Sequence, residues 1–115
     1  MSDARGRALQ NAFAETYLRD NGWPHAESVG AGRQGTDVKG TPGIVWEIKT
    51  ARNFKRDFRP LQWRAQSRSH AKNGGDIPVA IYFPQGTGAA SCGDTIAMVP
   101  AHVLVRLLHE AGYGT

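Results

Sequence analysis

The 115-residue chain contains little that would place it outside the cell or in a membrane. Cys92 is the single cysteine, which excludes an intramolecular disulfide and a zinc site built from several thiolates. No apolar run approaches the roughly 20 residues that cross a bilayer. No charged-then-apolar signal segment opens the chain. These absences predict a cytoplasmic protein without a membrane partner, folded as a single domain over residues 1–115.

Acidic residues are also scarce, with 10 against 14 lysines and arginines, so the net charge is +4. The basic residues are concentrated between positions 49 and 72, where Asp57 is the only acid. Such a segment attracts a polyanion, although a solvated surface remains the alternative. Its members are Lys49, Arg52, Lys55, Arg56, Arg59, Arg64, Arg68 and Lys72.

The most informative stretch joins Asp37 to Glu47 and Lys49 through a turn at 40–43. Residues 44–49 have the β-branched and aromatic content of a strand. Alternation then places Glu47 and Lys49 on one face and the apolar Trp46 on the other. A hairpin closing at 40–43 brings Asp37 alongside Glu47. Two carboxylates and a lysine then converge near a strand end, which suits Mg²⁺ and a phosphate substrate. The alternative is a surface pair of Glu47 and Lys49 with Asp37 as a turn residue.

The remaining pattern predicts a mixed β-sheet of about five strands flanked by helices, an α/β sandwich. On the first helix we expect one face to contain Ala8, Leu9, Ala12, Phe13, Thr16 and Tyr17. The apolar stripe of the last helix is expected to pack in the core. The expected elements are a helix to about residue 20, strands at 25–29, before 40, at 44–49, 78–83 and 95–100, helices at 60–73 and 101–111, and a mobile loop at 84–94.

A series of short motifs runs along nearly the whole chain. They are Arg5-Gly6-Arg7, Asn21-Gly22-Trp23-Pro24, the 27–32 segment, Gly35-Thr36-Asp37-Val38, and Trp46-Glu47-Ile48-Lys49, followed by a helix with Gln62 and Gln66. In order and spacing, this series resembles the PD-(D/E)xK nuclease superfamily, in particular the archaeal-type Holliday junction resolvases and similar phage-encoded endonucleases. The resemblance lies in the series rather than in any one motif.

The resemblance implies a restriction-endonuclease-like core and a metal-dependent DNA endonuclease that resolves four-way junctions as a homodimer. Asp37, Glu47 and the main-chain carbonyl of Ile48 would bind Mg²⁺, for which Mn²⁺ substitutes. Lys49 would activate water, and Gln66, with Gln62 second, would support the site. DNA contacts are expected from the basic residues of the segment above that run from Arg52 to Lys72, together with Arg5, Arg7 and Arg33. Arg5 and Arg7 also fit solvated helix ends, and Ser28 fits either a phosphate contact or a plain loop.

The chain departs from this family in its first helix. The resolvases have a glutamate there, whereas the matching position falls on Gln10 or Asn11, with Glu15 one turn further along. We therefore expect a site built from Asp37 and Glu47, with Gln10 near metal-bound water. The departure leaves two alternatives open. One is a DNA-binding module with a decayed nuclease site, and the other is a flap, nicking or restriction-like nuclease.

Overall fold

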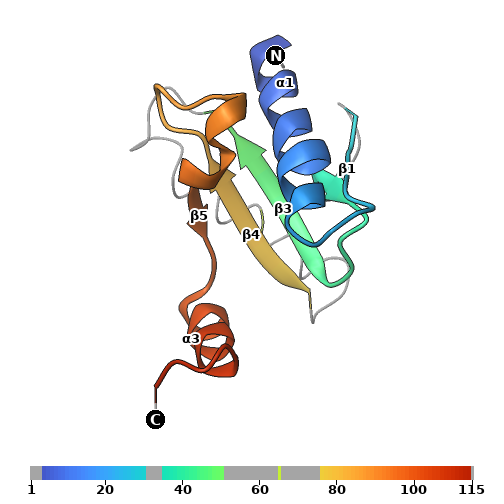
Figure 1. The fold of residues 1–115 in the computed structure, drawn as a ribbon. Helices are drawn as coiled ribbons and strands as arrows, with labels where there is room; N and C mark the ends of the chain where they lie inside the picture. The colour runs from blue at the N-terminus through green and yellow to red at the C-terminus, as the bar shows by residue number, and fades with distance from the viewer. Residues whose placement is uncertain (1–3, 31–34, 51–64, 66–75, 115) are drawn as a thin grey trace.

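A computed structural model describes residues 4–30, 35–50, 65 and 76–114 of the chain (Figure 1). The described residues form a mixed α/β fold with five strands, as predicted at that level. The helix predicted at 60–73 lies outside them, except for Ala65. In chain order the elements are α1 (Ala4–Ala12), the π-helix η1 (Phe13–Leu18), β1 (Glu27–Ser28), β2 (Val38–Lys39), β3 (Ile44–Lys49), β4 (Ile77–Tyr82), the 3₁₀-helix η2 (Ala89–Asp94), β5 (Ile96–Met98) and α3 (Ala101–Glu110).

The strands form two sheets rather than the single sheet predicted. β1 pairs antiparallel with β2, while β3 pairs parallel with β4 and β4 antiparallel with β5. The sheets are separate because side chains take the place of a strand along the outer edge of β3. The Trp46 amide donates to Thr36 Oγ1 at 2.8 Å, and the Ile48 amide donates to Asp37 Oδ2 at 2.7 Å. The approach of residues 36 and 37 to β3 is therefore held by these two side-chain contacts together with one backbone bond, from the Asp37 amide to the Trp46 carbonyl at 2.8 Å.

The first helix extends as far as predicted, but its second half is a π-helix rather than an α-helix. α1 continues into η1, whose wider turns contain about one more residue than an α-helical turn. Leu9, Phe13 and Leu18 are consequently buried at spacings of four and five, while Thr16 is exposed. The predicted face was right for Leu9 and Phe13, which are buried, and for Ala12 and Tyr17, which are partly buried against the core. It was wrong for Ala8 and Thr16, both of which are exposed. Gly22, with φ +115°, ends the helix as expected.

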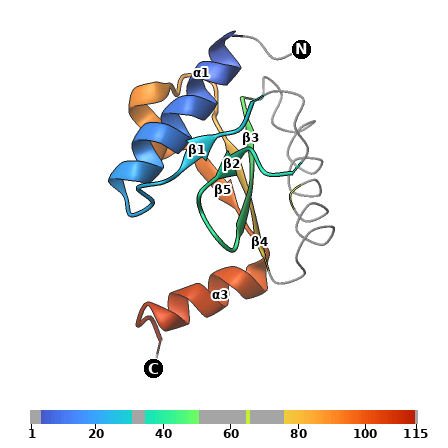
Figure 2. The ribbon, with the colours of Figure 1, turned by 90° about the vertical axis from the view of Figure 1, so that its right-hand side faces the viewer.

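The main core lies between this helix and one face of the three-stranded sheet, as the two ribbon views agree (Figures 1 and 2). Phe13 is at its centre, with ring centroids 5.6 Å from Trp46 and 6.3 Å from Phe83. Trp46 Nε1 donates to the buried Thr41 Oγ1 at 2.9 Å, so the indole is satisfied inside the core. The predicted apolar face of β3 is therefore confirmed.

The second face of the sheet has its own smaller apolar cluster. Ala65, Ala80, Tyr82 and Met98 are all buried and pack together there. Because register partners in a parallel pair share a face, the Glu47 side chain neighbours Ala80. The face predicted to hold Glu47 and Lys49 is thus largely apolar.

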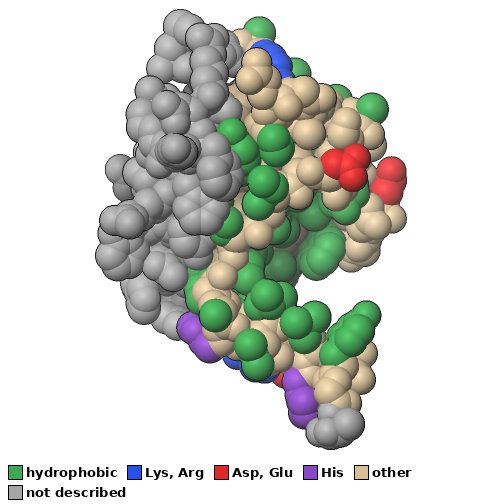
Figure 3. All heavy atoms as spheres, turned by 90° about the vertical axis from the view of Figure 1, so that its left-hand side faces the viewer, with side chains coloured by type: hydrophobic (Ala, Val, Ile, Leu, Met, Phe, Trp, Pro, Cys, Tyr) green, Lys and Arg blue, Asp and Glu red, His purple; other side chains and the backbone are tan. Residues whose placement is uncertain are grey.

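Three predictions for the C-terminal half need correction or refinement. The 84–94 segment is not all loop, because η2 occupies Ala89–Asp94 and buries Cys92. The strand predicted at 95–100 is limited to β5. The apolar stripe of α3 does not pack into the core of the described residues, where only Val103 of this helix is buried. Hydrophobic side chains gather on the surface where α3 lies (Figure 3). No helix among the described residues is long and apolar enough to span a membrane.

The 40–43 turn depends on a close backbone contact at Gly40. A Cβ on Gly40 (φ +85°) would lie 2.0 Å from the His25 carbonyl oxygen. The structure offers a matched control, since Gly43 has φ +83° and a Cβ there would meet nothing within 4 Å. We expect Gly43→Ala to cost about 1–2 kcal/mol for the left-handed backbone alone.

Gly40→Ala adds the steric clash to the same backbone cost, so we expect a loss of about 3 kcal/mol or more in the free energy of unfolding. Urea denaturation of the two variants measures the difference. Equal losses would contradict the close approach of Gly40 to His25.

Candidate active site

Asp37 lies against β3, where the sequence placed it. Its amide donates to the Trp46 carbonyl at 2.8 Å, and its Oδ2 accepts the Ile48 amide at 2.7 Å. These two bonds bracket Glu47 along the strand. Val38, the next residue, is fully buried in the main core, so strand alternation directs Asp37 away from that core. The predicted approach of Asp37 to the Glu47 segment is confirmed.

The carbonyl of Ile48 lies on the same edge as Asp37. In a strand, the N–H and C=O of one residue point to the same side. Gly43 and Lys49 use their carbonyls toward β4, accepting from Ile77 and Phe83. Trp46 and Ile48 therefore point to the opposite edge, where Thr36 and Asp37 lie. This placement puts a main-chain oxygen beside the Asp37 carboxylate.

Glu47 is one of the few buried polar residues of the described chain, with 4% of its surface exposed. It lies on the second face of the sheet, next to Ala80 and the small apolar cluster. A carboxylate is costly to bury, and buried acids are concentrated at functional sites, which makes Glu47 a candidate site residue. The alternative of a solvated surface pair is wrong for Glu47. Lys49, two residues along the same face, is half-buried at the end of β3.

These groups form an oxygen-rich donor set for a hard cation. Glu47 supplies a carboxylate and Ile48 a carbonyl from β3, and Asp37, just before β2, supplies a second carboxylate at the outer edge of β3. Mg²⁺ accepts such oxygens and retains several waters, so two carboxylates fit its requirements. No group of three or more histidine, cysteine, aspartate or glutamate side chains with metal-binding geometry occurs in the part of the chain that the structure describes. The proposed set consists of oxygens alone, without the nitrogen and sulfur donors typical of zinc sites, and so suits Mg²⁺ better than zinc.

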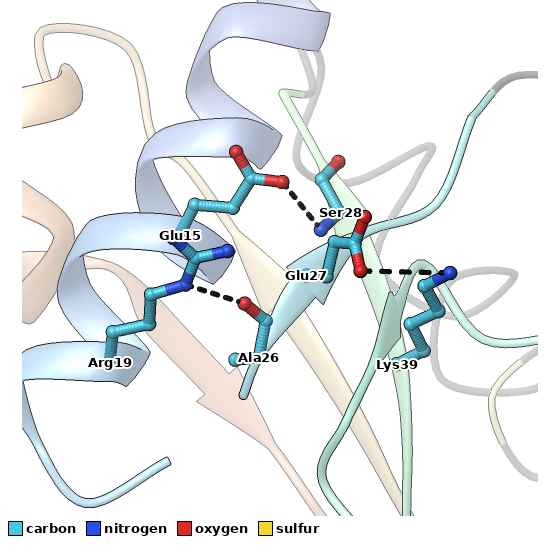
Figure 4. A network of polar contacts seen from close by, with 6 residues as sticks. All are labelled: Glu15, Arg19, Ala26, Glu27, Ser28 and Lys39. Atoms are coloured by element: carbon cyan, nitrogen blue, oxygen red, sulfur yellow. Dashed lines mark hydrogen bonds and ion pairs between the residues drawn. The ribbon is translucent and has the colours of Figure 1, made fainter. Parts of the chain in front are cut away.

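A row of polar side chains on the first helix fastens β1 to it. Arg7 Nη1 donates to the Val29 carbonyl at 3.2 Å, and Arg19 Nε donates to the Ala26 carbonyl at 2.8 Å. Glu15 Oε2 accepts the Ser28 amide at 3.0 Å (Figure 4). Glu15 thus binds backbone on β1. Glu27 points toward Lys39 and away from the helix, with Nζ 3.6 Å from Oε1 (Figure 4).

Gln10 belongs to the same row but reaches further. Its Nε2 lies 3.0 Å from Ser28 Oγ, 3.0 Å from the Val29 carbonyl and 3.1 Å from the Asp37 carbonyl. The expected contact of Gln10 with metal-bound water stays a prediction, while the observed contacts are to β1 and to Asp37 itself. Ser28, for which a phosphate contact was one alternative, lies in β1 with its hydroxyl beside Gln10.

The sequence interpretation missed Thr36, which organises the approach of Asp37 to β3. Thr36 Oγ1 donates to the Val38 carbonyl at 2.8 Å and accepts the Trp46 amide at 2.8 Å. A threonine directly before a turn acid often bonds nearby backbone, and that signal was present in Gly35-Thr36-Asp37.

Many predicted DNA contacts fall outside the described residues. Of the arginines predicted to contact DNA, Arg5 and Arg7 are described, and both bind main chain: Arg7 as above, and Arg5 through Nη2 to the Thr87 carbonyl at 3.1 Å. The predicted residues outside the described ranges are Arg33, Arg52, Lys55, Arg56, Arg59, Gln62, Arg64, Gln66, Arg68 and Lys72.

Cys92 is buried, and this burial raises the pKa of its thiol, which disfavours a nucleophilic role.

The chain was compared with known protein families, curated proteins and solved structures. A scan against protein-family models found no match, and searches of curated proteins and of solved structures also found none.

The role of Thr36 can be tested with an isosteric change. Thr36→Val removes the acceptor of the Trp46 amide on the outer edge of β3, so we expect a loss of about 1–3 kcal/mol in the free energy of unfolding. Thr95→Val is the matched control, because Thr95 Oγ1 only donates to the Cys92 carbonyl. We expect the control to cost about 1 kcal/mol or less. Thermal and urea unfolding measure both, and equal losses would argue against the edge role of Thr36.

Proposed function

We propose that the protein is a metal-dependent DNA endonuclease with a restriction-endonuclease-like core, and that it cleaves four-way junctions. The observation that carries the proposal is the buried Glu47 carboxylate, flanked along β3 by the two backbone bonds of Asp37. The order of elements around β3 and the resemblance of the motifs support the same class. The basic segment after Lys49 supports a polyanionic substrate.

Each residue of the site has a distinct part in this proposal. Asp37 and Glu47, with the Ile48 carbonyl, would hold Mg²⁺ or Mn²⁺. When bound, the ion lowers the pKa of a water and stabilises negative charge on the phosphate. Lys49 Nζ orients the attacking water and offsets charge that develops on the phosphate oxygens. Gln66 supports Lys49 or the water. The basic residues bind phosphates and thereby select shape rather than base sequence.

A second candidate is a DNA-binding module whose nuclease site has decayed. The contacts of Gln10 favour it, because an amide bound to backbone stands where the similar resolvases have an acid. This module would bind DNA in a salt-sensitive manner without cleavage. A flap, nicking or restriction-like nuclease differs from the first proposal only in substrate.

Cleavage of a labelled four-way junction, a flap and a linear duplex with Mg²⁺, Mn²⁺ or EDTA tests the proposal. We expect paired cuts on the junction that EDTA abolishes. We expect Glu47→Ala and Lys49→Ala each to reduce the rate at least about 100-fold, because each removes a group that acts on the reacting phosphate. DNA binding and folding should be retained.

The exposed ion pair of β1 and β2 provides controls of the same residue types. Glu27→Ala and Lys39→Ala remove a carboxylate and an ammonium from the surface, so cleavage should stay near the wild-type rate. Full activity in Glu47→Ala or Lys49→Ala would contradict the site. Binding without cleavage under every metal would favour the decayed module, and cleavage of the flap or duplex would change the substrate.

The proposal includes a homodimer formed through α3. Leu104, Val105, Leu107 and Leu108 are 42–65% exposed on this helix, whereas the opposite side has His102 and Arg106. An apolar helix face of this kind on a folded domain marks an interaction surface. A two-fold axis would pair the same patch on two copies, which is what paired cuts on a symmetric junction require.

Sedimentation of two lysine variants tests this surface. Leu108→Lys places a charge within the apolar face, so the dimer should dissociate at concentrations where the wild type remains paired. His102→Lys adds the same residue to the opposite, exposed side of α3 and should leave the mass unchanged. A monomeric wild type, or equal behaviour of the two variants, would refute dimerisation through this face.

A further inference from the structure

Gln10 connects the first helix to the backbone of the candidate metal-binding residue Asp37. Its Nε2 is within 3.0–3.1 Å of Ser28 Oγ and of the Val29 and Asp37 carbonyls. The Asp37 carbonyl also accepts the Val29 amide at 2.9 Å. Both lone pairs of this carbonyl are therefore used, one by the strand and one by the helix side chain.

The chemistry of these partners requires an amide at position 10. Two of the three are carbonyl oxygens, which only accept hydrogen bonds. A glutamate of the same shape would direct its charged oxygens at both carbonyls and would lose both bonds. The side chain at this position therefore acts as a donor to the backbone in the geometry that the structure describes.

We propose that Gln10 is a positioning residue, which fixes the backbone of Asp37 so that its carboxylate stays on the edge of β3. The importance of Gln10 for catalysis rests on the proposed function. Its effect on the position of Asp37 can be measured without cleavage. The path is short: the helix holds the Asp37 carbonyl, and the carboxylate of the same residue accepts the Ile48 amide at 2.7 Å. Release of the first contact loosens the second.

The Ile48 amide reports this positioning directly. It is not part of the β3–β4 pairing, since it donates to Asp37 Oδ2 on the other edge. Its hydrogen exchange therefore follows the Asp37 contact. The Ile77 and Phe83 amides, which donate to Gly43 and Lys49 of β3, follow opening of the sheet and serve as internal references.

Glu15 supplies a matched control on the same helix. Its Oε2 also binds β1, by accepting the Ser28 amide at 3.0 Å, whereas Gln10 contacts both β1 and the Asp37 carbonyl. A general loosening of β1 from the helix would affect Glu15→Ala and Gln10→Ala alike. If Gln10 specifically positions Asp37, only Gln10→Ala should change the exchange of the Ile48 amide.

The experiment is amide hydrogen exchange by NMR on the full-length protein without DNA or metal. In Gln10→Ala and in the isosteric Gln10→Glu, we expect Ile48 exchange to accelerate about fivefold or more relative to Ile77 and Phe83. In Glu15→Ala the ratio should stay as in the wild type. An unchanged Ile48 ratio in both Gln10 variants, or an equal increase in Glu15→Ala, would overturn the proposal.

A Mn²⁺ titration of the same proteins adds a functional readout. We expect both Gln10 variants to bind Mn²⁺ at least about threefold more weakly than the wild type, with Glu15→Ala unchanged. Tighter binding by Gln10→Glu, with Ile48 still protected, would overturn the positioning role and make position 10 a ligand position. A wild type that binds no Mn²⁺ would refute the proposed function, while the exchange data would still decide the positioning role.

Discussion

The outer edge of β3 is the constraint on which the rest of the site depends. A strand edge must satisfy its N–H and C=O groups, and a partner strand normally does so. Here Thr36 and Asp37 take that place, with side-chain oxygens as acceptors for Trp46 and Ile48. The consequence is chemical as well as structural, because satisfying the edge in this way brings a carboxylate beside Glu47. A regular β2–β3 ladder would have used backbone carbonyls instead.

The π-helical turn links this edge to the rest of the fold. In a regular helix, the residue four after Gln10 would be Ala14, which would bring a methyl group to β1. The extra residue of η1 brings Glu15 there instead, so that Gln10 and Glu15 both bind the backbone of residues 28 and 29. Leu18 is buried in the core, and Tyr17 packs against this core with its ring centroid 5.4 Å from that of Phe13. One irregular turn thus serves both the packing of the helix and the attachment of β1, from which Gln10 reaches Asp37.

The sequence was sufficient for the features that depend on local pattern. Alternation along residues 44–49 identified the core face of β3, and the turn at 40–43 predicted that Asp37 returns to this strand, where it binds the backbone of Trp46 and Ile48. It was insufficient where the outcome depends on distant partners. Helical periodicity assumes 3.6 residues per turn, so the face occupied by Thr16 was mispredicted once η1 widened. Nor did the apolar stripe of α3 reveal that the described chain would leave it exposed.

The two faces of the three-stranded sheet explain how a carboxylate can be buried in so small a domain. The face under the helix buries Phe13, Trp46 and Phe83, and each large apolar side chain fully removed from water contributes about 1.5–3 kcal/mol. On the opposite face, the described residues form a smaller cluster of two alanines, a tyrosine and a methionine. The aromatic core can therefore offset the desolvation of Glu47. A buried carboxylate is thus compatible with the stability of the domain, which is the physical condition that the proposed site requires.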